Sequence, residues 1–122
     1  MKTNTIILLL LFLVLFSVQS CEPDNRVWVF IDPIQCLENP WELAWLEEHD
    51  DDYDAYPKSE GDRRKIFVHY YEIKGVEIDK IKQTYPYDAT CDGCDCPRGD
   101  RIHCLIHEDD VEQMVAWGFQ EE

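Results

Sequence analysis

The segment Cys91–Cys104, with the sequence CDGCDCPRGDRIHC, contains four of the six cysteines of the chain within fourteen residues. It includes a Cys-x-x-Cys pair and an Arg-Gly-Asp tripeptide between Cys96 and Cys104, and His107 follows shortly after it. Three kinds of chemistry use such residues: a metal site, a loop closed by disulfides, and a cell-adhesion loop. The rest of the chain has to distinguish them.

A structural zinc site needs four thiolate or imidazole ligands. The candidates are Cys91, Cys94, Cys96 and Cys104, with His103 or His107 as possible replacements. The CxxC is a suitable half-site, but the second half lacks the repeated CxxC spacing of zinc ribbons. In a strand, side-chain alternation also directs His103 and His107 to the side opposite Cys104. The spacing therefore favours a cysteine-tied loop and keeps zinc binding as an alternative.

Redox and adhesion functions fit this segment less well. A thioredoxin-like CxxC lies at a helix N-terminus, whereas this one lies in a predicted loop beside Asp92 and Asp95, whose negative charges disfavour a thiolate. The loop from Cys96 to Cys104 resembles the RGD loop of disintegrins, but the chain has too few cysteines for that framework. Pro97 and Gly99 are typical turn residues, so we expect a turn leading into a strand at Arg101.

Catalytic motifs are missing from the sequence. There is no G-x-S-x-G, no H-E-x-x-H and no recognisable Ser, His and acid arrangement. The four histidines are scattered, and paired acidic residues carry no specificity in a chain with 26 of them. We therefore expect no enzymatic activity.

Residues 1–20 have the features of a secretory signal. Lys2 is followed by an apolar run from Ile6 to Val18, which is too short for a comfortable bilayer crossing, and small Ser20 precedes Cys21. The segment Ser17-Val-Gln-Ser-Cys21 resembles a bacterial lipobox, which implies lipidation of Cys21 and attachment to a membrane. Ordinary cleavage after Ser20 is the alternative, and it would release a soluble factor in which Cys21 pairs with another cysteine such as Cys36.

The charge of the mature part restricts its partners. Removal of residues 1–20 takes away Lys2 and no acidic residue, so the formal charge becomes −16, one unit more negative than the −15 of the whole chain. Such a surface repels nucleic acid and anionic headgroups. We expect no nucleic-acid partner and no contact with a membrane other than through a lipid on Cys21.

The chain after residue 26 predicts one small α+β domain. Short apolar or alternating runs predict strands over 26–32, 76–83 and 101–107, with Ile102, Cys104 and Ile106 on one side of the last. Asn39, Pro40 and Glu42 form a helix start of the capping-box type. We predict a helix over residues 60–74 that ends at Gly75, with a strand as the alternative because these residues include aromatic and β-branched side chains. We expect an antiparallel sheet of two to three strands with two to three packed helices.

The last helix is predicted to begin near Asp109, which would form a capping pair with Glu112. Val111, Met114 and Val115 would make its buried stripe, and Gly118-Phe119 would end it. The domain organisation is therefore a signal over 1–20, a lipidated tether over 21–26 and a single domain over 27–122 that carries the cysteine-rich loop 91–104.

The number of cysteines depends on the fate of Cys21. If Cys21 carries lipid, five remain, and one must stay unpaired or pair between molecules. If it is free, six cysteines allow fifteen connectivities. The candidates for disulfides or a metal are Cys36, Cys91, Cys94, Cys96 and Cys104.

Short motifs over most of the mature part resemble small uncharacterised lipoproteins of Bacteroidota-type bacteria. They are Asn39-Pro-Trp-Glu42, Trp45-Leu46, Tyr70-Tyr71, Cys91-x-x-Cys94-x-Cys96-Pro97, Gly99-Asp100 and Gly118-Phe119. The resemblance implies a location in the bacterial cell envelope and no particular activity. We therefore predict an envelope-anchored, non-enzymatic binding or interaction module, with another envelope protein as a candidate partner. A zinc module built on the cysteine cluster and a secreted disulfide-rich factor are the alternatives.

Overall fold

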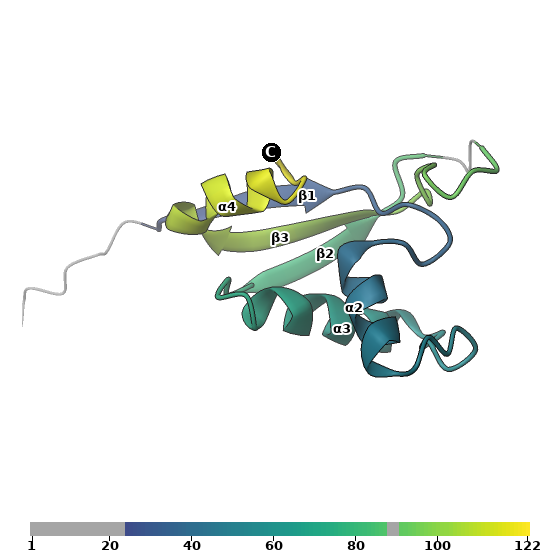
Figure 1. Cartoon of the computed structure of the whole chain (residues 1–122). Helices are drawn as coiled ribbons and strands as arrows, with labels where there is room; N and C mark the ends of the chain where they lie inside the picture. Colours follow the sequence, from purple (N-terminus) through teal and green to yellow (C-terminus); the bar gives the residue numbers. More distant parts are fainter. Residues whose placement is uncertain (1–23, 88–90) are drawn as a thin grey trace, which may run out of the picture.

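A computed structural model describes residues 24–87 and 91–122, so the predicted signal and Cys21 lie outside the described residues. Along the chain the elements are β1 (Arg26–Ile31), α2 (Pro40–Glu48), α3 (Glu60–Glu72), β2 (Lys80–Thr84), β3 (Arg101–His107), the 3₁₀ turn η1 (Glu108–Asp110), α4 (Val111–Ala116) and β4 (Gln120–Glu121). Figure 1 shows their arrangement. None of the helices in these two ranges is long and apolar enough to cross a bilayer.

The four strands form one antiparallel sheet in the order β2-β3-β1-β4. The α+β class is confirmed, but the predicted two to three strands are too few. The missed strand, β4, has two residues and pairs Gln120 with Phe30, so no alternating pattern could reveal it. The order of elements and strands is that of the split β-α-β, or ferredoxin-like, arrangement, with α2 and α3 in the first crossover and α4 in the second.

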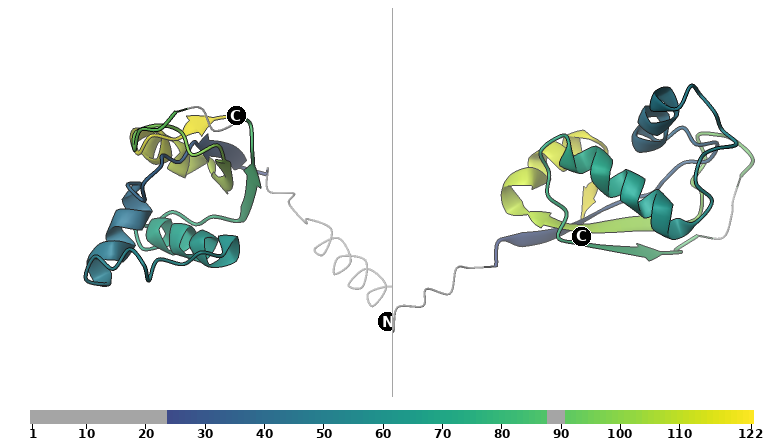
Figure 2. Two further views of the ribbon diagram at one scale, coloured as in Figure 1. Left: turned by 90° about the vertical axis from the view of Figure 1, so that its right-hand side faces the viewer. Right: turned by 90° about the horizontal axis from the view of Figure 1, so that it is seen from below.

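One face of this sheet forms the hydrophobic core. Val29 of β1 lies opposite Cys104 of β3, and both are fully buried beneath the helices. Phe67 of α3 and Met114 of α4 belong to the same buried cluster, and Trp41 of α2 packs edge-on against Phe67 with ring centroids 4.8 Å apart. All three α-helices therefore contribute to one core on one side of the sheet, as the end view in Figure 2 shows.

The opposite face of the sheet has no helix over it among the described elements. Its aromatic rings are covered by basic side chains instead: Lys82 lies over Trp28, 4.3 Å from the ring centroid, and Arg101 lies over Phe30 at 4.0 Å. Long basic side chains can shield apolar surface with their stems while the charge stays in water. The aromatic residues on this face are therefore partly buried without a covering element.

The helix predictions for residues 39–48 and 60–74 are confirmed. Glu42 accepts a hydrogen bond from the backbone N–H of Asn39, as the capping box requires, and Pro40 occupies the first turn of α2. The helix α3 is capped by Ser59, whose hydroxyl accepts from the N–H of Asp62. Capping residues in the sequence predicted α2, whereas the prediction for α3 rested on residues 60–74 and Gly75 and did not include its cap, Ser59.

The strand predicted from residue 76 begins later, at Lys80. Residues 73–76 end α3 instead: Gly75 has a φ of +93°, and the N–H of Val76 donates back to the carbonyl of Tyr71 at 3.1 Å. Val76 is buried in the core from this turn rather than from a strand. A hydrophobic residue after a C-cap glycine commonly locks a helix end in this way.

The start of the last helix also differs from the prediction. A 3₁₀ turn comes first, and its cap is the ring of His107, which accepts a hydrogen bond from the N–H of Asp109. The predicted Asp109–Glu112 capping pair does not form. Met114 is buried as expected, but Val115, the next residue around α4, is 47% exposed. The predicted end is confirmed by the positive φ of Gly118 and the burial of Phe119.

Candidate functional site

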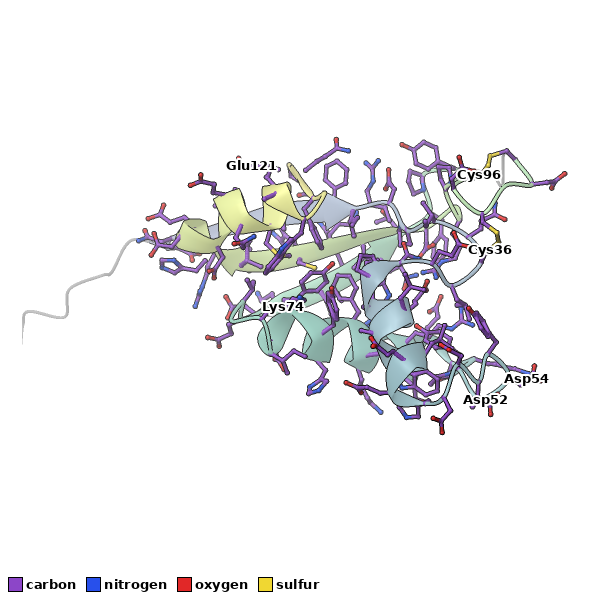
Figure 3. The ribbon with its side chains drawn as sticks, in the orientation of Figure 1. Cys36, Asp52, Asp54, Lys74, Cys96 and Glu121 are labelled. Carbon is purple, nitrogen blue, oxygen red and sulfur yellow. A yellow bond between two sulfur atoms is a disulfide. The ribbon has the colours of Figure 1, made fainter. Side chains whose placement is uncertain are left out.

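The cysteines of the loop are joined in two disulfides. Cys36 pairs with Cys94, which links the segment after β1 to the loop, and Cys91 pairs with Cys96 within the loop. The CxxC pair is therefore divided between two bridges. Both bridges lie at one end of the molecule, where Figure 3 labels Cys36 and Cys96. Disulfides suggest an oxidising compartment, in agreement with the predicted export.

The pairing bears directly on the zinc interpretation. Four of the five candidate residues are in disulfides, which hold no thiolate for a metal. Cys104 is a free, fully buried thiol in the core, on the face of β3 opposite His103. Within the ranges that the structure describes, no group of three or more His, Cys, Asp or Glu residues is placed to hold a metal ion. Zinc binding would need the reduced protein and stays a prediction.

Backbone hydrogen bonds tie the loop to the segment after β1. The N–H of Gln35 donates to the carbonyl of Cys96 at 3.0 Å, and the N–H of Arg98 donates to the carbonyl of Pro33 at 2.8 Å. The side chain of Gln35 adds a bond to the carbonyl of Cys91 at 2.8 Å. The Cys36–Cys94 bridge therefore reinforces a pairing that already sets the position of Arg98.

The Arg-Gly-Asp tripeptide is part of a buried ion-pair network. Arg98 donates two hydrogen bonds to Asp100, from Nε at 2.8 Å and from Nη2 at 3.0 Å, and a third from Nη1 to Glu42 at 2.8 Å. Asp100 also accepts from Gln83 at 2.6 Å. Asp100 is 4% exposed and Glu42 is fully buried. The tripeptide thus faces the protein, as the turn interpretation expected, and not an adhesion receptor.

This network explains the ionisation of its members. Burial raises the pKa of Asp100, but the hydrogen bonds and charge of Arg98, with the amide of Gln83, more than offset it and hold the pKa below the usual range. Burial lowers the pKa of Arg98, and its two carboxylate partners more than restore it. Asn39 completes the network by donating from Nδ2 to Glu42 at 2.6 Å. Each of the five side chains therefore has at least one hydrogen-bond partner within the network.

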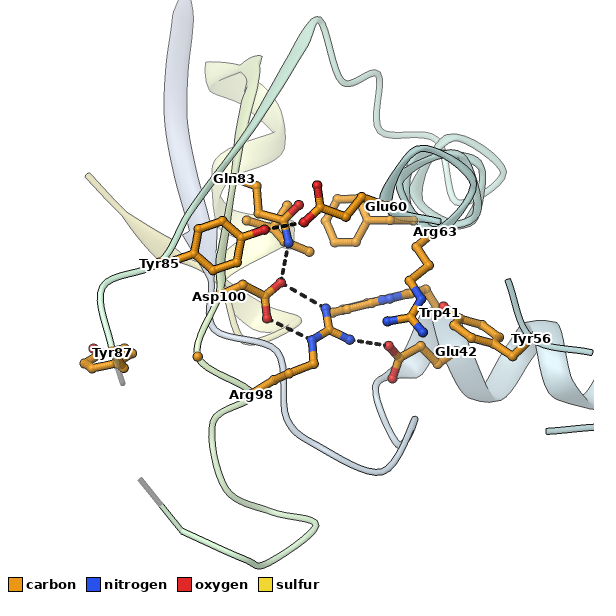
Figure 4. Close-up of a pocket in the computed structure, with 13 residues that line it drawn as sticks. Trp41, Glu42, Tyr56, Glu60, Arg63, Gln83, Tyr85, Tyr87, Arg98 and Asp100 are labelled. Carbon is orange, nitrogen blue, oxygen red and sulfur yellow. Dashed lines mark hydrogen bonds and ion pairs between the residues drawn. The ribbon is translucent and has the colours of Figure 1, made fainter. Parts of the chain in front are cut away.

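A pocket of about 290 Å³ lies beside this network. We call it the Arg98 pocket. Its residues come from α2, α3 and the segment between them, from β2 and the segment after it, and from the cysteine-rich loop and β3. They are Trp41, Glu42, Tyr56, Glu60, Arg63, Phe67, Gln83, Tyr85, Tyr87, Arg98, Gly99, Asp100 and Ile102. In Figure 4, Gln83, Tyr85 and Asp100 lie on one side of the pocket, in β2 and in the segments next to β2 and β3, and Glu42, Tyr56 and Arg63 lie on the other side, in α2, α3 and the segment between them.

Two exposed tyrosines lie at the rim of the Arg98 pocket. Tyr85 is 64% exposed and its hydroxyl donates to the carboxylate of Glu60. Tyr87 is 44% exposed, and its hydroxyl accepts a hydrogen bond from Nη2 of Arg101 at 3.0 Å. Gly99 belongs to the same wall: its φ is +113°, and a Cβ there would lie 3.4 Å from the carbonyl oxygen of Tyr87. A glycine lets the loop approach the rim closely.

In the Arg98 pocket, the guanidinium of Arg63 has no acidic partner and the hydroxyl of Tyr56 has no hydrogen-bond partner among the described residues. Arg63 donates from Nε to the carbonyl of Pro57 at 2.6 Å but forms no ion pair with any carboxylate in the described ranges. The hydroxyl of Tyr56 is buried and has no hydrogen-bond partner there. Buried polar groups in proteins are nearly always paired, so the Tyr56 hydroxyl is an exception, and the half-buried guanidinium of Arg63 lies over the ring of the same tyrosine.

A second hollow, of about 300 Å³, lies between α2 and α3. Its walls are more apolar and include Trp41, Trp45 and Tyr70, and the ring of His49 stacks on Trp45 with centroids 3.7 Å apart. We call it the α2–α3 groove. The two tryptophans of α2 therefore divide their roles: Trp41 is a core residue, and Trp45 is a partly exposed wall of the groove.

The sequence indicated some of these residues and missed others. Turn and capping patterns in the sequence mark Arg98, Asp100 and Glu42, but these patterns do not connect the three residues. No local motif marks Tyr56, Arg63 or Gln83, so the sequence did not predict them as site residues. No family model, curated protein or solved structure matches this chain.

Proposed function

We propose that this chain is an exported, non-enzymatic binding module that holds a small polar ligand in the Arg98 pocket. In this proposal a lipid on Cys21 anchors it to the bacterial cell envelope, and the disulfide-tied loop keeps one wall of the pocket rigid. The observation that carries the proposal is the combination of a preformed pocket with two unused polar groups, the guanidinium of Arg63 and the hydroxyl of Tyr56. Concave sites with a few convergent polar groups are the usual form of ligand sites.

The binding role is preferred over catalysis because of how the charged groups are used. Arg98 donates to both Glu42 and Asp100 at 2.8–3.0 Å. A general acid or base has to be poised to exchange a proton with a bound substrate, and a carboxylate held by a guanidinium is poorly suited to that. We assign these residues to the wall of the pocket.

The tether is tested by the intact mass of the mature protein from a bacterial membrane fraction. Lipidation predicts an added acyl-glyceryl mass that maps to an N-terminal Cys21. A Cys21 found in a disulfide with Cys36 would support the secreted factor instead, and it would also require a rearrangement of the Cys36–Cys94 bridge. Thiol counting on the same sample tests the zinc alternative, which requires reduced cysteines.

Ligand binding is tested by thermal unfolding against a collection of small polar compounds, measured with the oxidised domain spanning residues 22–122. A compound that binds only the folded state raises the Tm, by an amount that grows with its concentration. We expect at least one compound to do so. A collection that includes acids, amines and neutral molecules and that leaves the Tm unchanged at millimolar concentration would contradict the proposal.

A further inference from the structure

We infer that the ligand of the Arg98 pocket carries a carboxylate, which Arg63 and Tyr56 bind together. This inference rests on the proposed binding function and specifies the chemistry of the ligand. It follows from the charges that the protein itself leaves unpaired in the pocket.

Arg63 differs from the other basic residues of the described ranges. Arg26, Lys65, Lys82, Arg98 and Arg101 each form an ion pair with an acidic residue. Those without an ion pair, Lys58, Arg64, Lys74 and Lys80, are exposed to water. Arg63 alone is partly buried and has no carboxylate within 4.0 Å. In so acidic a chain, a half-buried guanidinium without an acidic partner is a site for an external anion.

The orientation of Arg63 suits this role. Its Nε is occupied by the carbonyl of Pro57, which holds the plane of the guanidinium and leaves the two terminal nitrogens without a partner among the described residues. A guanidinium presents such nitrogens as a planar fork that matches the two oxygens of a carboxylate. The hydrogen bond to Pro57 therefore prepares Arg63 for a bidentate contact.

The ring of Tyr56 lies beside Arg63, and its hydroxyl is the second polar group of the pocket without a partner among the described residues. The guanidinium carbon of Arg63 lies 5.4 Å from the centroid of the Tyr56 ring. Burial, with a smaller contribution from the charge of Glu42, raises the pKa of Tyr56 to about 12, although Arg63 and Arg98 oppose the rise. The hydroxyl therefore keeps its proton at neutral pH and is available as a donor to an acceptor oxygen.

The acidic residues of the pocket are bonded to other side chains and form no ion pair with Arg63. Glu42 and Asp100 are bonded to Arg98, and Glu60 accepts from Tyr85. Their charges disfavour a second anionic group on the same ligand. Trp41, Phe67 and Ile102 provide an apolar wall, so the ligand class is a small monocarboxylate with an apolar body.

Three probes of nearly the same shape test the inference: benzoate, benzamide and benzylamine, each titrated into the oxidised domain spanning residues 22–122 and followed by nitrogen–hydrogen NMR spectra. We expect benzoate to move the Arg63 Nε–H resonance and the amides of Trp41, Gln83 and Ile102. Benzamide should bind at least about tenfold more weakly, since hydrogen bonds to charged partners are the stronger ones. Benzylamine should leave the Arg63 resonance unchanged.

Variants identify the residues responsible. Arg63→Gln should weaken benzoate by at least about tenfold and remove its advantage over benzamide. Arg64→Gln removes the same charge from an exposed neighbour on α3 and is the matched control, so it should leave the benzoate affinity within about twofold. The two variants separate a specific contact from the general field of the protein.

Tyr56→Phe gives a readout that a merely structural role would not. It should weaken benzoate by about three- to tenfold, since a neutral hydrogen bond is lost. In the absence of ligand the same variant should unfold at a Tm equal to or above that of the wild type, because it removes a buried hydroxyl without a partner. Weaker binding in an equally stable protein cannot come from misfolding.

The outcomes separate this inference from the proposed function. If benzamide or benzylamine binds the pocket as tightly as benzoate, the carboxylate inference is wrong and the binding function stands. If none of the three moves a pocket resonance, the inference is wrong as well, and the thermal screen then decides the binding function. An equal loss of benzoate affinity in Arg63→Gln and Arg64→Gln would also overturn it.

Discussion

Nη1 of Arg98 donates a hydrogen bond of 2.8 Å to Oε1 of Glu42, a fully buried carboxylate in the first turn of α2. The two residues are 56 positions apart, and this contact joins the disulfide-tied loop to the helix layer. It also gives one wall of the Arg98 pocket a defined position. The same contact turns the charged ends of the Arg-Gly-Asp tripeptide inward.

The Glu42→Gln variant tests the energetic weight of this contact. It leaves Arg98 partly buried with one charged partner in place of two, and we expect it to lower the free energy of unfolding by about 2 kcal/mol. Urea unfolding of the oxidised domain measures the change. Glu47→Gln, an exposed position on the same helix, is the control and should change stability by less than about 0.5 kcal/mol. Equal effects of the two variants would show that the Arg98–Glu42 pair has no special role.

Asp100 predicts an acid-dependent loss of stability. Its pKa in the folded protein is lower than in the unfolded chain, so the unfolded state binds the proton more readily. The contribution of Asp100 is therefore fully present above its unfolded pKa of about 4, and it disappears as the pH falls through the lower folded value. Urea unfolding from pH 7 to pH 2 should show the Asp100→Asn variant less stable than the wild type at neutral pH. The difference should shrink on acidification.

A stability difference that stays constant across this pH range would contradict the ionic role of Asp100. Asp92→Asn is a suitable control, because Asp92 is exposed in the same loop and has no ion pair in the described ranges. It should show the same pH dependence as the wild type.

The two disulfides should differ in their contributions. Cys36–Cys94 spans 58 residues and Cys91–Cys96 spans 5, which on loop-closure entropy corresponds to roughly 4 and roughly 2 kcal/mol. Each bridge can be removed by a pair of serine substitutions. The pair Cys36→Ser with Cys94→Ser should therefore lower the Tm more than the pair Cys91→Ser with Cys96→Ser. Thermal unfolding under oxidising conditions measures both. The reverse order would show that the long bridge does not restrain the unfolded chain as the fold implies.

Cys104 should be unreactive in the folded protein. It is fully buried, and burial raises the pKa of its thiol to about 12, so almost no thiolate is present at neutral pH. Iodoacetamide followed by peptide mass mapping should modify Cys104 only after denaturation, and should find Cys36, Cys91, Cys94 and Cys96 protected in both states without a reductant. Rapid labelling of the folded protein at Cys104, or labelling of the other four, would contradict the structure.

The predictability of the fold follows the range of the interactions. The strand β3 was predicted over its full length because the spacing of Ile102, Cys104 and Ile106 places them on one side of a strand, and α2 was predicted from Asn39, Pro40 and Glu42. Both signals lie within a few residues. The two-residue strand β4 was missed because it exists only by pairing with β1.

The candidate site shows the same limit. The cysteines were identified as a tied loop, but their connectivity depends on how the segment after β1 meets the loop, through Gln35 and Pro33. The Arg-Gly-Asp tripeptide was correctly predicted as a turn, yet its buried partner Glu42 lies 56 positions from Arg98, in α2. Arg63 is ordinary in the sequence of α3, and it becomes a site residue only because no carboxylate reaches it in the fold.

The most direct test of the binding proposal is a map of amide chemical-shift changes in the nitrogen-15-labelled domain with a compound that raises its Tm. We predict changes concentrated at Trp41, Phe67, Gln83, Gly99 and Ile102, around the Arg98 pocket. Changes concentrated at Trp45, Ile66, His69 and Ile73 would instead place the ligand in the α2–α3 groove, and would contradict the proposal.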